Sequence, residues 1–298
     1  MNCRLCGSNK NIIKRADFVF GGKEEHKFWE CSDCGVIFLY PFLSEEEEKY
    51  FYNKEFEKFM SSRSGRERDW SNAKKHILTN QDQVERRFKF LEKYLKPNMK
   101  ILEIGCSTGF MMKAFKEFGA ESVGIEPSGE FLPFLQNEGF RAYESLEEFI
   151  KENPDEKFDL IVHFFVFEHI SDPLSFLKST YELLKPNGNI IAEIPSSTDV
   201  LTSVYNIPSF EKFYWSIAHH YYYNPKSIEY IVKKLGYKYS IDPEQRYDLS
   251  NHITWLMDGK PGGQGKFELF SNDTLESYRK DLMSNWKCDT LILKIFKD

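Results

Sequence analysis

The stretch ILEIGCSTGF at residues 101–110 decides the fold of this chain. An apolar segment runs into a turn with two glycines, and an amphipathic segment follows. Glycine suits such a turn because, without a Cβ, the backbone can bend sharply and a ligand can approach closely. The spacing excludes two phosphate loops. A dinucleotide fingerprint needs glycine or alanine where this chain has Ser107 and Phe110, and a P-loop needs Gly-Lys at Phe110 and Met111.

Helix and strand signals alternate from about residue 80 onward. Strand patterns lie at 100–104, 121–126, 158–164, 188–194, 237–241 and 291–296, and helical patterns at 84–96, 109–118, 128–137, 173–184 and 225–235. This alternation predicts an α/β fold in which a doubly wound, mostly parallel sheet is covered on both faces. In such sheets ligands bind at the carboxyl ends of the strands.

An acid ends the second of these strands. Glu126 follows Gly105 by 21 residues, close to the offset of about 20 residues at which an acid meets the ribose in nucleotide folds. A carboxylate at this place can accept hydrogen bonds from both ribose hydroxyls. A glycine turn alone also occurs in other α/β proteins, so motifs further along the chain are needed to decide between the two interpretations.

Three motifs in order resemble those of class I S-adenosylmethionine-dependent methyltransferases. The first is Glu103-x-Gly105-x-Ser107-x-Gly109, with serine in place of the middle glycine. The second follows the 158–164 strand as Glu-His and a short Asp-Pro turn at 168–173, and the third is the Leu-Leu-Lys-Pro-Asn-Gly turn at 183–188.

The resemblance covers residues 100–195 and implies a Rossmann-like sheet of seven strands with a late hairpin at its edge. It also implies S-adenosylmethionine as the cofactor. The cofactor-binding residues that it implies are Glu103, Gly105, Cys106, Ser107, Gly109, Glu126, Pro127, Phe164 and Phe165.

Two cysteine pairs give the second strong signal. Cys3-x-x-Cys6 and Cys31-x-x-Cys34 are separated by 24 residues, and glycine follows the second cysteine of each pair. Four thiolates suit a tetrahedral structural zinc, and glycine tolerates the left-handed geometry that aims both sulfurs inward. Disulfides are the alternative, and a reducing compartment disfavours them.

These signals divide the chain into three parts. Residues 1–60 form a zinc ribbon and a following helix, which begins at Ser44 with a capping box to Glu47. Residues 61–79 are polar and predict a linker or a loop ordered by ligand. Residues 80–298 form the methyltransferase domain, with substrate insertions at 196–224 and 242–267.

The ribbon makes the layout similar to methyltransferases with an N-terminal zinc ribbon, including sugar C-methyltransferases that act on nucleotide-linked keto-sugars. In that group a histidine ahead of an aromatic pair serves as general base, which implies His219, with His220 as the competitor. Glu168 and His169 are further catalytic candidates. The alternative for that pair is a helix start that only caps and packs.

The two insertions supply the candidate substrate-binding residues. The connection at 196–224 is long and rich in aromatic residues, as lids and substrate walls often are. Arginine could bind a phosphate or carboxylate in a fork geometry, and the alternative for the 242–267 segment is a glycine-rich surface loop. The candidates are Tyr214, Trp215, Tyr222, Arg246, Asn251 and His252.

Composition and charge limit the kinds of molecule that this protein is expected to bind. The chain has 298 residues, 41% of them apolar, and a formal net charge of −6. The absence of a basic tract argues against a nucleic-acid partner, and no apolar run approaches the roughly 18 residues of a membrane span. We expect a cytoplasmic protein without a signal peptide, and the sequence leaves its oligomeric state open.

The predicted function is methyl transfer from S-adenosylmethionine to a small molecule, with an activated or modified sugar favoured and the acceptor atom (C, O or N) open. One alternative is an RNA methyltransferase that uses the zinc ribbon to hold nucleic acid. Another is a scaffold that binds S-adenosylmethionine without catalysis.

Overall fold

A seven-stranded sheet forms the centre of the molecule in this computed structural model, which describes residues 1–64 and 72–298. The strand order is β10-β11-β8-β7-β4-β5-β6. β11 is antiparallel to both neighbours, whereas the pairs from β8 to β6 are parallel. The strands are β4 (Lys100–Ile104), β5 (Glu121–Ile125), β6 (Arg141–Tyr143), β7 (Phe158–Phe164), β8 (Leu184–Pro195), β10 (Lys238–Glu244) and β11 (Thr290–Phe296). The predicted α/β fold with a mostly parallel sheet is confirmed.

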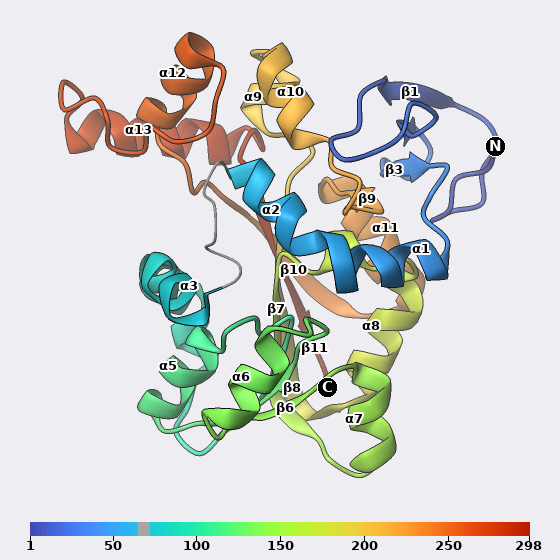
Figure 1. Cartoon of the computed structure of the whole chain (residues 1–298), viewed down its shortest axis with the longest axis vertical. Coiled ribbons are helices and arrows are strands. Elements are labelled where there is room, and N and C mark those ends of the chain that lie inside the picture. The colour runs from blue at the N-terminus through green and yellow to red at the C-terminus, as the bar shows by residue number, and fades with distance from the viewer. Residues whose placement is uncertain (65–71) are drawn as a thin grey trace.

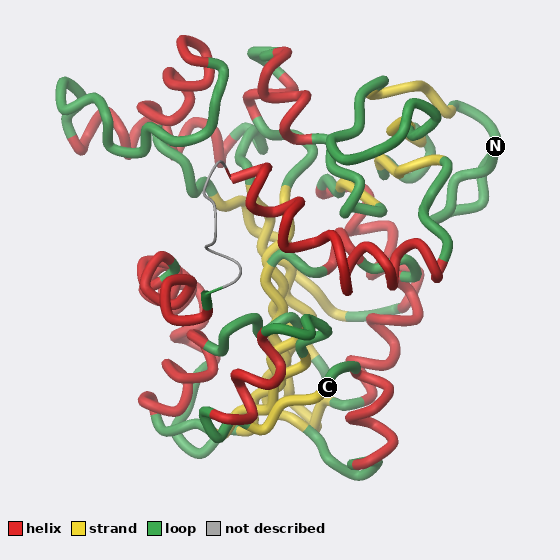
Figure 2. Tube along the Cα trace, viewed as in Figure 1, coloured by secondary structure: helices red, strands yellow, loops and turns green. Residues whose placement is uncertain are grey.

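Helices cover both faces of this sheet, so that the strands lie between two helical layers (Figure 2). One face carries α4 (Gln81–Leu91), α5 (Phe110–Phe118) and α6 (Phe131–Asn137), and the other carries α7 (Leu146–Glu152), α8 (Pro173–Glu182) and α11 (Pro225–Leu235). Successive strand residues point to opposite faces, so Ile101 packs with α4 and α5 whereas Leu102 packs with α7 and α8. Side chains therefore fill both faces, and the edge at the strand ends remains for ligands.

Two short elements of the central domain were not predicted. β6 has three residues and α7 has seven, and both are too short to give a clear periodic pattern. The predicted helix at 84–96 is the α4 helix followed by a 3-10 turn, η2 (Glu92–Tyr94). The other predicted strands and helices agree with the structure to within a few residues.

A second sheet joins the N-terminal segment to the 196–224 connection. Its strands are β1 (Ile12–Ala16), β2 (Lys27–Cys31), β3 (Ile37–Tyr40) and β9 (Tyr221–Tyr222), in that order. β3 pairs with β9 through Ile37 opposite Tyr222 and Phe38 opposite Tyr221. The N-terminal segment therefore shares hydrogen bonds with a strand from the far part of the chain.

A helical run connects this sheet to the central domain. It consists of α1 (Glu45–Tyr50), the π-helical η1 (Phe51–Glu55) and α2 (Phe56–Ser64). Both halves of the predicted capping box are present, since Glu47 N donates to Ser44 Oγ at 3.2 Å and Ser44 N donates to Glu47 Oε2 at 3.0 Å. Within the predicted linker 61–79, residues 65–71 lie outside the described residues, and the flanking parts belong to α2 and to α3 (Ala73–Thr79).

The remaining elements gather with the second sheet at one end of the central sheet (Figure 1). They are η3 (Phe167–His169), α9 (Val200–Ser203), α10 (Pro208–Tyr214), α12 (Leu249–Asp258) and α13 (Asn272–Ser284). The turns that follow β4, β5 and β7 open toward this end, where the sequence predicted ligand binding. Among the described residues, the structure contains no helix with the length and hydropathy of a membrane span.

Candidate active site

The turn after β4 requires glycine at two positions. Gly105 and Gly109 both have φ of +72°, a left-handed conformation that residues with a Cβ rarely adopt. A Cβ on Gly105 would lie 2.5 Å from Val166 Cγ2, and one on Gly109 would lie 2.6 Å from Leu135 Cδ2. Glycine at these two positions therefore allows the turn to pack closely against Val166, which follows β7, and against Leu135 of α6.

Glu126 ties the end of β5 to this turn. Its Oε2 accepts a hydrogen bond from Ser107 N at 2.6 Å, and its Oε1 accepts one from Ser128 N at 2.9 Å. Burial raises the pKa of Glu126 to about 6, although these two backbone bonds oppose that rise. Each carboxylate oxygen can accept a second hydrogen bond, so the side chain could still receive two hydroxyls of a ribose.

Two buried polar atoms near the turn have no hydrogen-bond partner among the described residues: Glu103 Oε2 and Ser107 Oγ. Burial raises the pKa of Glu103 to about 8 against the opposing charge of Arg87. Ser107 also has φ of +52°, so the motif departs from glycine at a left-handed position. Buried polar groups are almost always paired, and the polar groups of a nucleoside cofactor could satisfy both atoms.

The other predicted cofactor residues occupy different surroundings. The Cys106 side chain points into the core, where its Sγ would lie 2.5 Å from a Cβ on Gly124. Pro127 is exposed, and Phe164 is buried with the Arg87 guanidinium 4.2 Å from its ring centre. Phe165, with φ of +57°, is half-buried where the chain leaves β7.

Glu168, His169 and His219 form a cluster beyond the carboxyl end of β7. One carboxylate oxygen and one ring nitrogen of each histidine all lie within 4.8 Å of one another. Glu168 Oε1 is 3.9 Å from His169 Nε2, and the two imidazole rings meet edge to face with their centres 4.7 Å apart. The structure thus brings together three of the four predicted catalytic residues.

Hydrogen bonds fix the tautomer of His169. Its Nδ1 lies 2.8 Å from the Ala218 carbonyl oxygen, which can only accept, so Nδ1 carries the proton. Tyr52 Oη, 2.9 Å from the same nitrogen, shares that proton as an acceptor. The lone pair of His169 is therefore on Nε2, on the side of Glu168.

Two atoms of the cluster are buried without a hydrogen-bond partner among the described residues, Glu168 Oε2 and His219 Nδ1. Burial raises the pKa of Glu168 to about 8 and lowers the pKa of His169 to about 4. Burial also lowers the pKa of His219 well below its usual value, with a smaller contribution from His169. Both histidines are therefore neutral near pH 7, with lone pairs available to a ligand.

His220 points in another direction. Its Nδ1 accepts from Arg4 Nη1 at 3.1 Å, and its Nε2 lies 3.3 Å from Glu48 Oε1. Both partners belong to the N-terminal 60 residues, so His220 links the 196–224 connection to that segment, whereas His219 lies with Glu168.

Three residues near these sites were not predicted from the sequence. Tyr52 contacts His169, as described above. Arg63 of α2 places its guanidinium carbon 4.7 Å from the Phe213 ring centre, and its charge contributes to the low pKa of His219. His76 Nδ1 lies 3.0 Å from Thr108 Oγ1, over the glycine turn. All three come from elements distant in sequence from the motifs, which offered no local signal for them.

The predicted aromatic substrate residues form a packed wall. Tyr214 Oη donates to the Ser196 carbonyl at 2.7 Å, and Tyr222 Oη is hydrogen-bonded to the Tyr214 carbonyl and to Ser216 N. Trp215 Nε1 is buried without a hydrogen-bond partner among the described residues. This wall stands beside the cluster, since the His219 and Tyr222 rings are 4.9 Å apart.

The candidates of the second insertion are engaged within the protein. Arg246 Nε donates to Asp289 Oδ1 at 3.1 Å, and its guanidinium carbon lies 4.3 Å from the Phe165 ring centre. Asn251 Nδ2 donates to the Gly262 carbonyl at 2.7 Å, and His252 Nδ1 lies 2.7 Å from Tyr278 Oη. Arg246 is thus the one closest to the turn after β7, while the other two hold α12 to its neighbours.

A cavity of about 630 Å³ opens beside Arg246. It lies between α4, the segment that follows β10, and α13, with Arg86, Gln245, Tyr247 and Arg279 among its walls. The glycine turn and Glu126 are outside this cavity. We assign the cofactor to the turn rather than to this cavity, because the turn brings two atoms without a partner among the described residues, Glu103 Oε2 and Ser107 Oγ, together with the Glu126 carboxylate.

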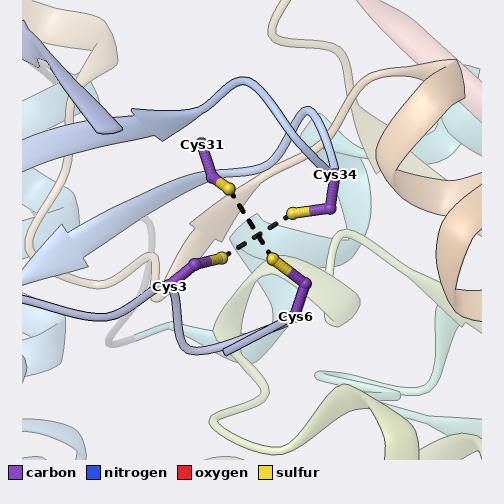
Figure 3. Close-up of side chains that lie close together, drawn as sticks. All are labelled: Cys3, Cys6, Cys31 and Cys34. Carbon is purple, nitrogen blue, oxygen red and sulfur yellow. Dashed lines mark hydrogen bonds between the residues drawn. The ribbon is translucent and has the colours of Figure 1, made fainter. Parts of the chain in front are cut away.

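The four N-terminal cysteines point toward one centre (Figure 3). Cys3 Sγ lies 3.7 Å from Cys34 Sγ, and Cys6 Sγ lies 3.6 Å from Cys31 Sγ. These separations exclude disulfides and fit a tetrahedral zinc, whose bonds of about 2.3 Å place sulfurs about 3.8 Å apart. Gly7 and Gly35 have φ of +78° and +81°, the left-handed geometry expected after each pair.

Comparisons with known proteins agree on the central domain. A family model described as a methyltransferase domain matches residues 76–240. The ubiquinone biosynthesis O-methyltransferase of Ruegeria pomeroyi is 32% identical over 95 residues, which cover 30% of this chain and 38% of that protein. The mitochondrial ubiquinone biosynthesis O-methyltransferase of Rattus norvegicus is 33% identical over 112 residues, covering 34% of this chain and 32% of that protein. The chain thus spans less than two fifths of either relative.

Solved structures share the fold. A SAM-dependent methyltransferase from Archaeoglobus fulgidus superposes with a TM-score of 0.52 at 22% identity, over 72% of this chain and 94% of that one. The plantazolicin methyltransferase BpumL in complex with SAH gives a TM-score of 0.51 at 15% identity, over 84% of this chain and 94% of that one.

Proposed function

Because the chain belongs to the methyltransferase domain family, we propose that it transfers a methyl group from S-adenosylmethionine to a small molecule. The favoured acceptor is an activated or modified sugar. The buried cluster of Glu168, His169 and His219 carries this proposal, since its unpaired polar atoms lie just beyond β7. Val166, which precedes the cluster in the chain, packs against Gly105 of the glycine turn.

We assign the cofactor-binding residues from the buried polar atoms that have no hydrogen-bond partner among the described residues. S-adenosylmethionine, when bound, supplies a methyl group on a positively charged sulfur. Glu126 receives the ribose hydroxyls, while Ser107 and Glu103 bind polar groups of the amino-acid part. Gly105 and Gly109 keep the turn open to the cofactor.

His219 acts as the general base for an acceptor hydroxyl or an acidic carbon. Its imidazole is neutral near pH 7 because burial lowers its pKa, and Nδ1 has no hydrogen-bond partner among the described residues. A positioned base of this kind contributes roughly 10²- to 10⁴-fold to a rate. The Tyr214–Tyr222 wall excludes water from one side of the acceptor.

A hydroxyl-rich acceptor fits this cluster because the free atoms are hydrogen-bonding groups. Transfer to oxygen is the version that the names of the relatives favour, since both relatives described above are O-methyltransferases. The cavity beside Arg246 has room for a further part of the acceptor. The four cysteines hold a structural zinc, which stabilises the N-terminal sheet as a ribbon.

Titration with S-adenosylhomocysteine and a turnover screen test this proposal. We expect one-to-one binding of S-adenosylhomocysteine, and methyl transfer from S-adenosylmethionine to sugar nucleotides rather than to phenols. His219→Gln should lower kcat by about 10²- to 10⁴-fold with unchanged S-adenosylhomocysteine affinity, and His220→Gln should cost less. Equal turnover in His219→Gln and the wild type would refute the assignment of His219 as the general base. Absence of S-adenosylhomocysteine binding would refute the assignment of the cofactor.

A further inference from the structure

We infer that Glu168, His169 and His219 form a second metal site, which binds a divalent cation that holds two neighbouring oxygens of the acceptor. This site is separate from the four cysteines. This inference rests on the proposed function only for the position of the acceptor. It predicts that the acceptor is a molecule with adjacent oxygens, such as a diol or a hydroxy-ketone.

The donor set suits a metal ion. Two imidazoles and one carboxylate are ligands that first-row divalent ions accept, and a set of three leaves coordination positions open. The three ligand atoms lie within 4.8 Å of one another. An ion with bonds of about 2.1 Å spaces its ligands about 3.0 to 3.5 Å apart, so modest side-chain rotations would close the set.

The hydrogen bond behind His169 also favours a metal ligand. Metal-binding histidines usually donate the proton of their other ring nitrogen to a carbonyl or carboxylate, which aims the free lone pair at the metal. Here His169 Nδ1 donates to the Ala218 carbonyl at 2.8 Å, so Nε2 presents its lone pair on the side of Glu168. This backbone contact orients the ring without help from any ion.

Two of the ligand side chains hold atoms that need a partner. Glu168 is 1% exposed and His219 is 6% exposed, yet Glu168 Oε2 and His219 Nδ1 have no hydrogen-bond partner within residues 1–64 and 72–298. Leaving such atoms unpaired is unfavourable, because each has lost its hydrogen bonds to water without gaining a partner in the protein. A cation coordinated by Glu168 and His219 satisfies both side chains.

A bound cation would explain how the site handles a hydroxyl acceptor. Oxygens in the open positions are oriented by coordination, and the positive charge lowers the pKa of a bound hydroxyl. In the cation-bound protein His219 coordinates the ion, and the lowered pKa of the bound hydroxyl takes over the role that the proposed function gives to His219 as general base. Arg63 lies near the cluster, and its positive charge opposes the binding of a cation. Glu168 is the one ligand of the three that can carry a negative charge to offset this repulsion, so its carboxylate is the essential ligand.

Mn²⁺ is the probe, because carboxylate and imidazole accept it whereas the four thiolates prefer zinc. Purified protein is treated with a mild chelator and titrated with Mn²⁺, while the free ion is followed by electron paramagnetic resonance. We expect one Mn²⁺ per chain, with hyperfine coupling to imidazole nitrogen in pulsed spectra of the bound ion. Glu168→Gln and His219→Gln should each weaken binding at least about tenfold.

Glu48→Gln is the matched control, because it makes the same change of carboxylate to amide beside His220, outside the cluster. It should leave Mn²⁺ affinity unchanged. Absence of saturable Mn²⁺ binding, absence of nitrogen coupling, or equal affinity in Glu168→Gln and wild type overturns the inference. S-adenosylhomocysteine binding is measured on the same samples. If the wild type binds S-adenosylhomocysteine but not Mn²⁺, only the cation site is rejected. If the wild type does not bind S-adenosylhomocysteine, the result counts against the proposed function.

Discussion

Left-handed backbone in the turn after β4 limits which residues that turn tolerates. Gly105 can be compared with Gly139, which lies between α6 and β6. Both have positive φ, +72° and +78° respectively, but a Cβ would meet Val166 Cγ2 at 2.5 Å only at position 105, and nothing within 4 Å at position 139. Comparing alanine substitutions at these two positions therefore separates the free-energy cost of a left-handed backbone from the cost of the steric contact with Val166.

We predict that Gly139→Ala lowers the free energy of unfolding by about 1 to 2 kcal/mol, the cost of a left-handed alanine. Gly105→Ala should cost more, because Val166 must move, and it should weaken S-adenosylhomocysteine binding. Urea denaturation and calorimetric titration measure the two effects. Equal destabilisation of the two variants with unchanged affinity would show that the contact with Val166 does not matter.

The residues of the turn were predictable because their signal is local. Gly105, Gly109 and Glu126 follow from the spacing of a strand, a turn and the next strand. The contact between Tyr52 and His169 joins residues 117 positions apart, and no periodic pattern encodes such a contact. Likewise, the sequence left His219 and His220 as alternatives, because only the turn at Ser216 to His219 sets which ring points toward Glu168.

At the scale of elements, the 196–224 connection was predicted as a substrate insertion, and its internal structure was not. It contains α9, α10 and β9, which are four, seven and two residues long. Elements of this length carry little periodic signal. β9 exists because β3 offers it an edge, and that pairing joins residues about 185 positions apart in the chain, Ile37 and Tyr222.

Asp199 provides a test within this connection. It caps α9, since its Oδ1 accepts from Leu201 N at 2.8 Å, and it is 4% exposed. Burial, reinforced by the charge of Asp289, raises the pKa of Asp199 to about 8. The folded state therefore binds a proton that the unfolded state, with a pKa near 4, releases. By linkage, this group lowers stability progressively as pH rises from about 4 to about 8.

Asp199→Asn keeps the cap, because asparagine caps helices as well as aspartate does, and it removes the titration. We predict that the free energy of unfolding of the variant, relative to the wild type, rises between pH 5 and pH 8.5. At about 1.4 kcal/mol per pKa unit, the gain is on the order of several kcal/mol. Denaturant unfolding at the two pH values measures it. The same difference between the two proteins at both pH values would show that the carboxyl does not titrate in this range.

At the scale of the whole molecule, the central sheet was predictable because strands and helices alternate regularly and parallel strands give continuous apolar runs. The relation of the N-terminal segment to it was not. Cys3, Cys31 and Phe38 belong to the same hydrophobic cluster as Leu102 and Ile161 of the central sheet. The N-terminal segment therefore packs as part of the main core. The four cysteines are connected to the cluster of Glu168, His169 and His219 through β3, β9 and the residues just before β9.

This connection predicts a long-range effect of metal loss. Cys31→Ser should remove the zinc, loosen β3, and raise amide hydrogen exchange at Tyr221 and Tyr222, because these residues depend on β3 for pairing. His219 closely precedes this strand, so turnover should fall. S-adenosylhomocysteine affinity should persist in the soluble fraction, because the turn after β4 and Glu126 belong to the central sheet.

Cys288→Ser is the matched control, since Cys288 is fully buried but lies outside the four-cysteine cluster. It should keep its zinc and its exchange pattern at β9. Metal analysis and hydrogen exchange measured by mass spectrometry compare the two variants. Undiminished zinc in Cys31→Ser would contradict the metal assignment. Zinc loss without faster exchange at residues 221–222 would instead show that β9 keeps its place without the zinc. The wall of Tyr214, Trp215 and Tyr222 would then depend on the central domain alone.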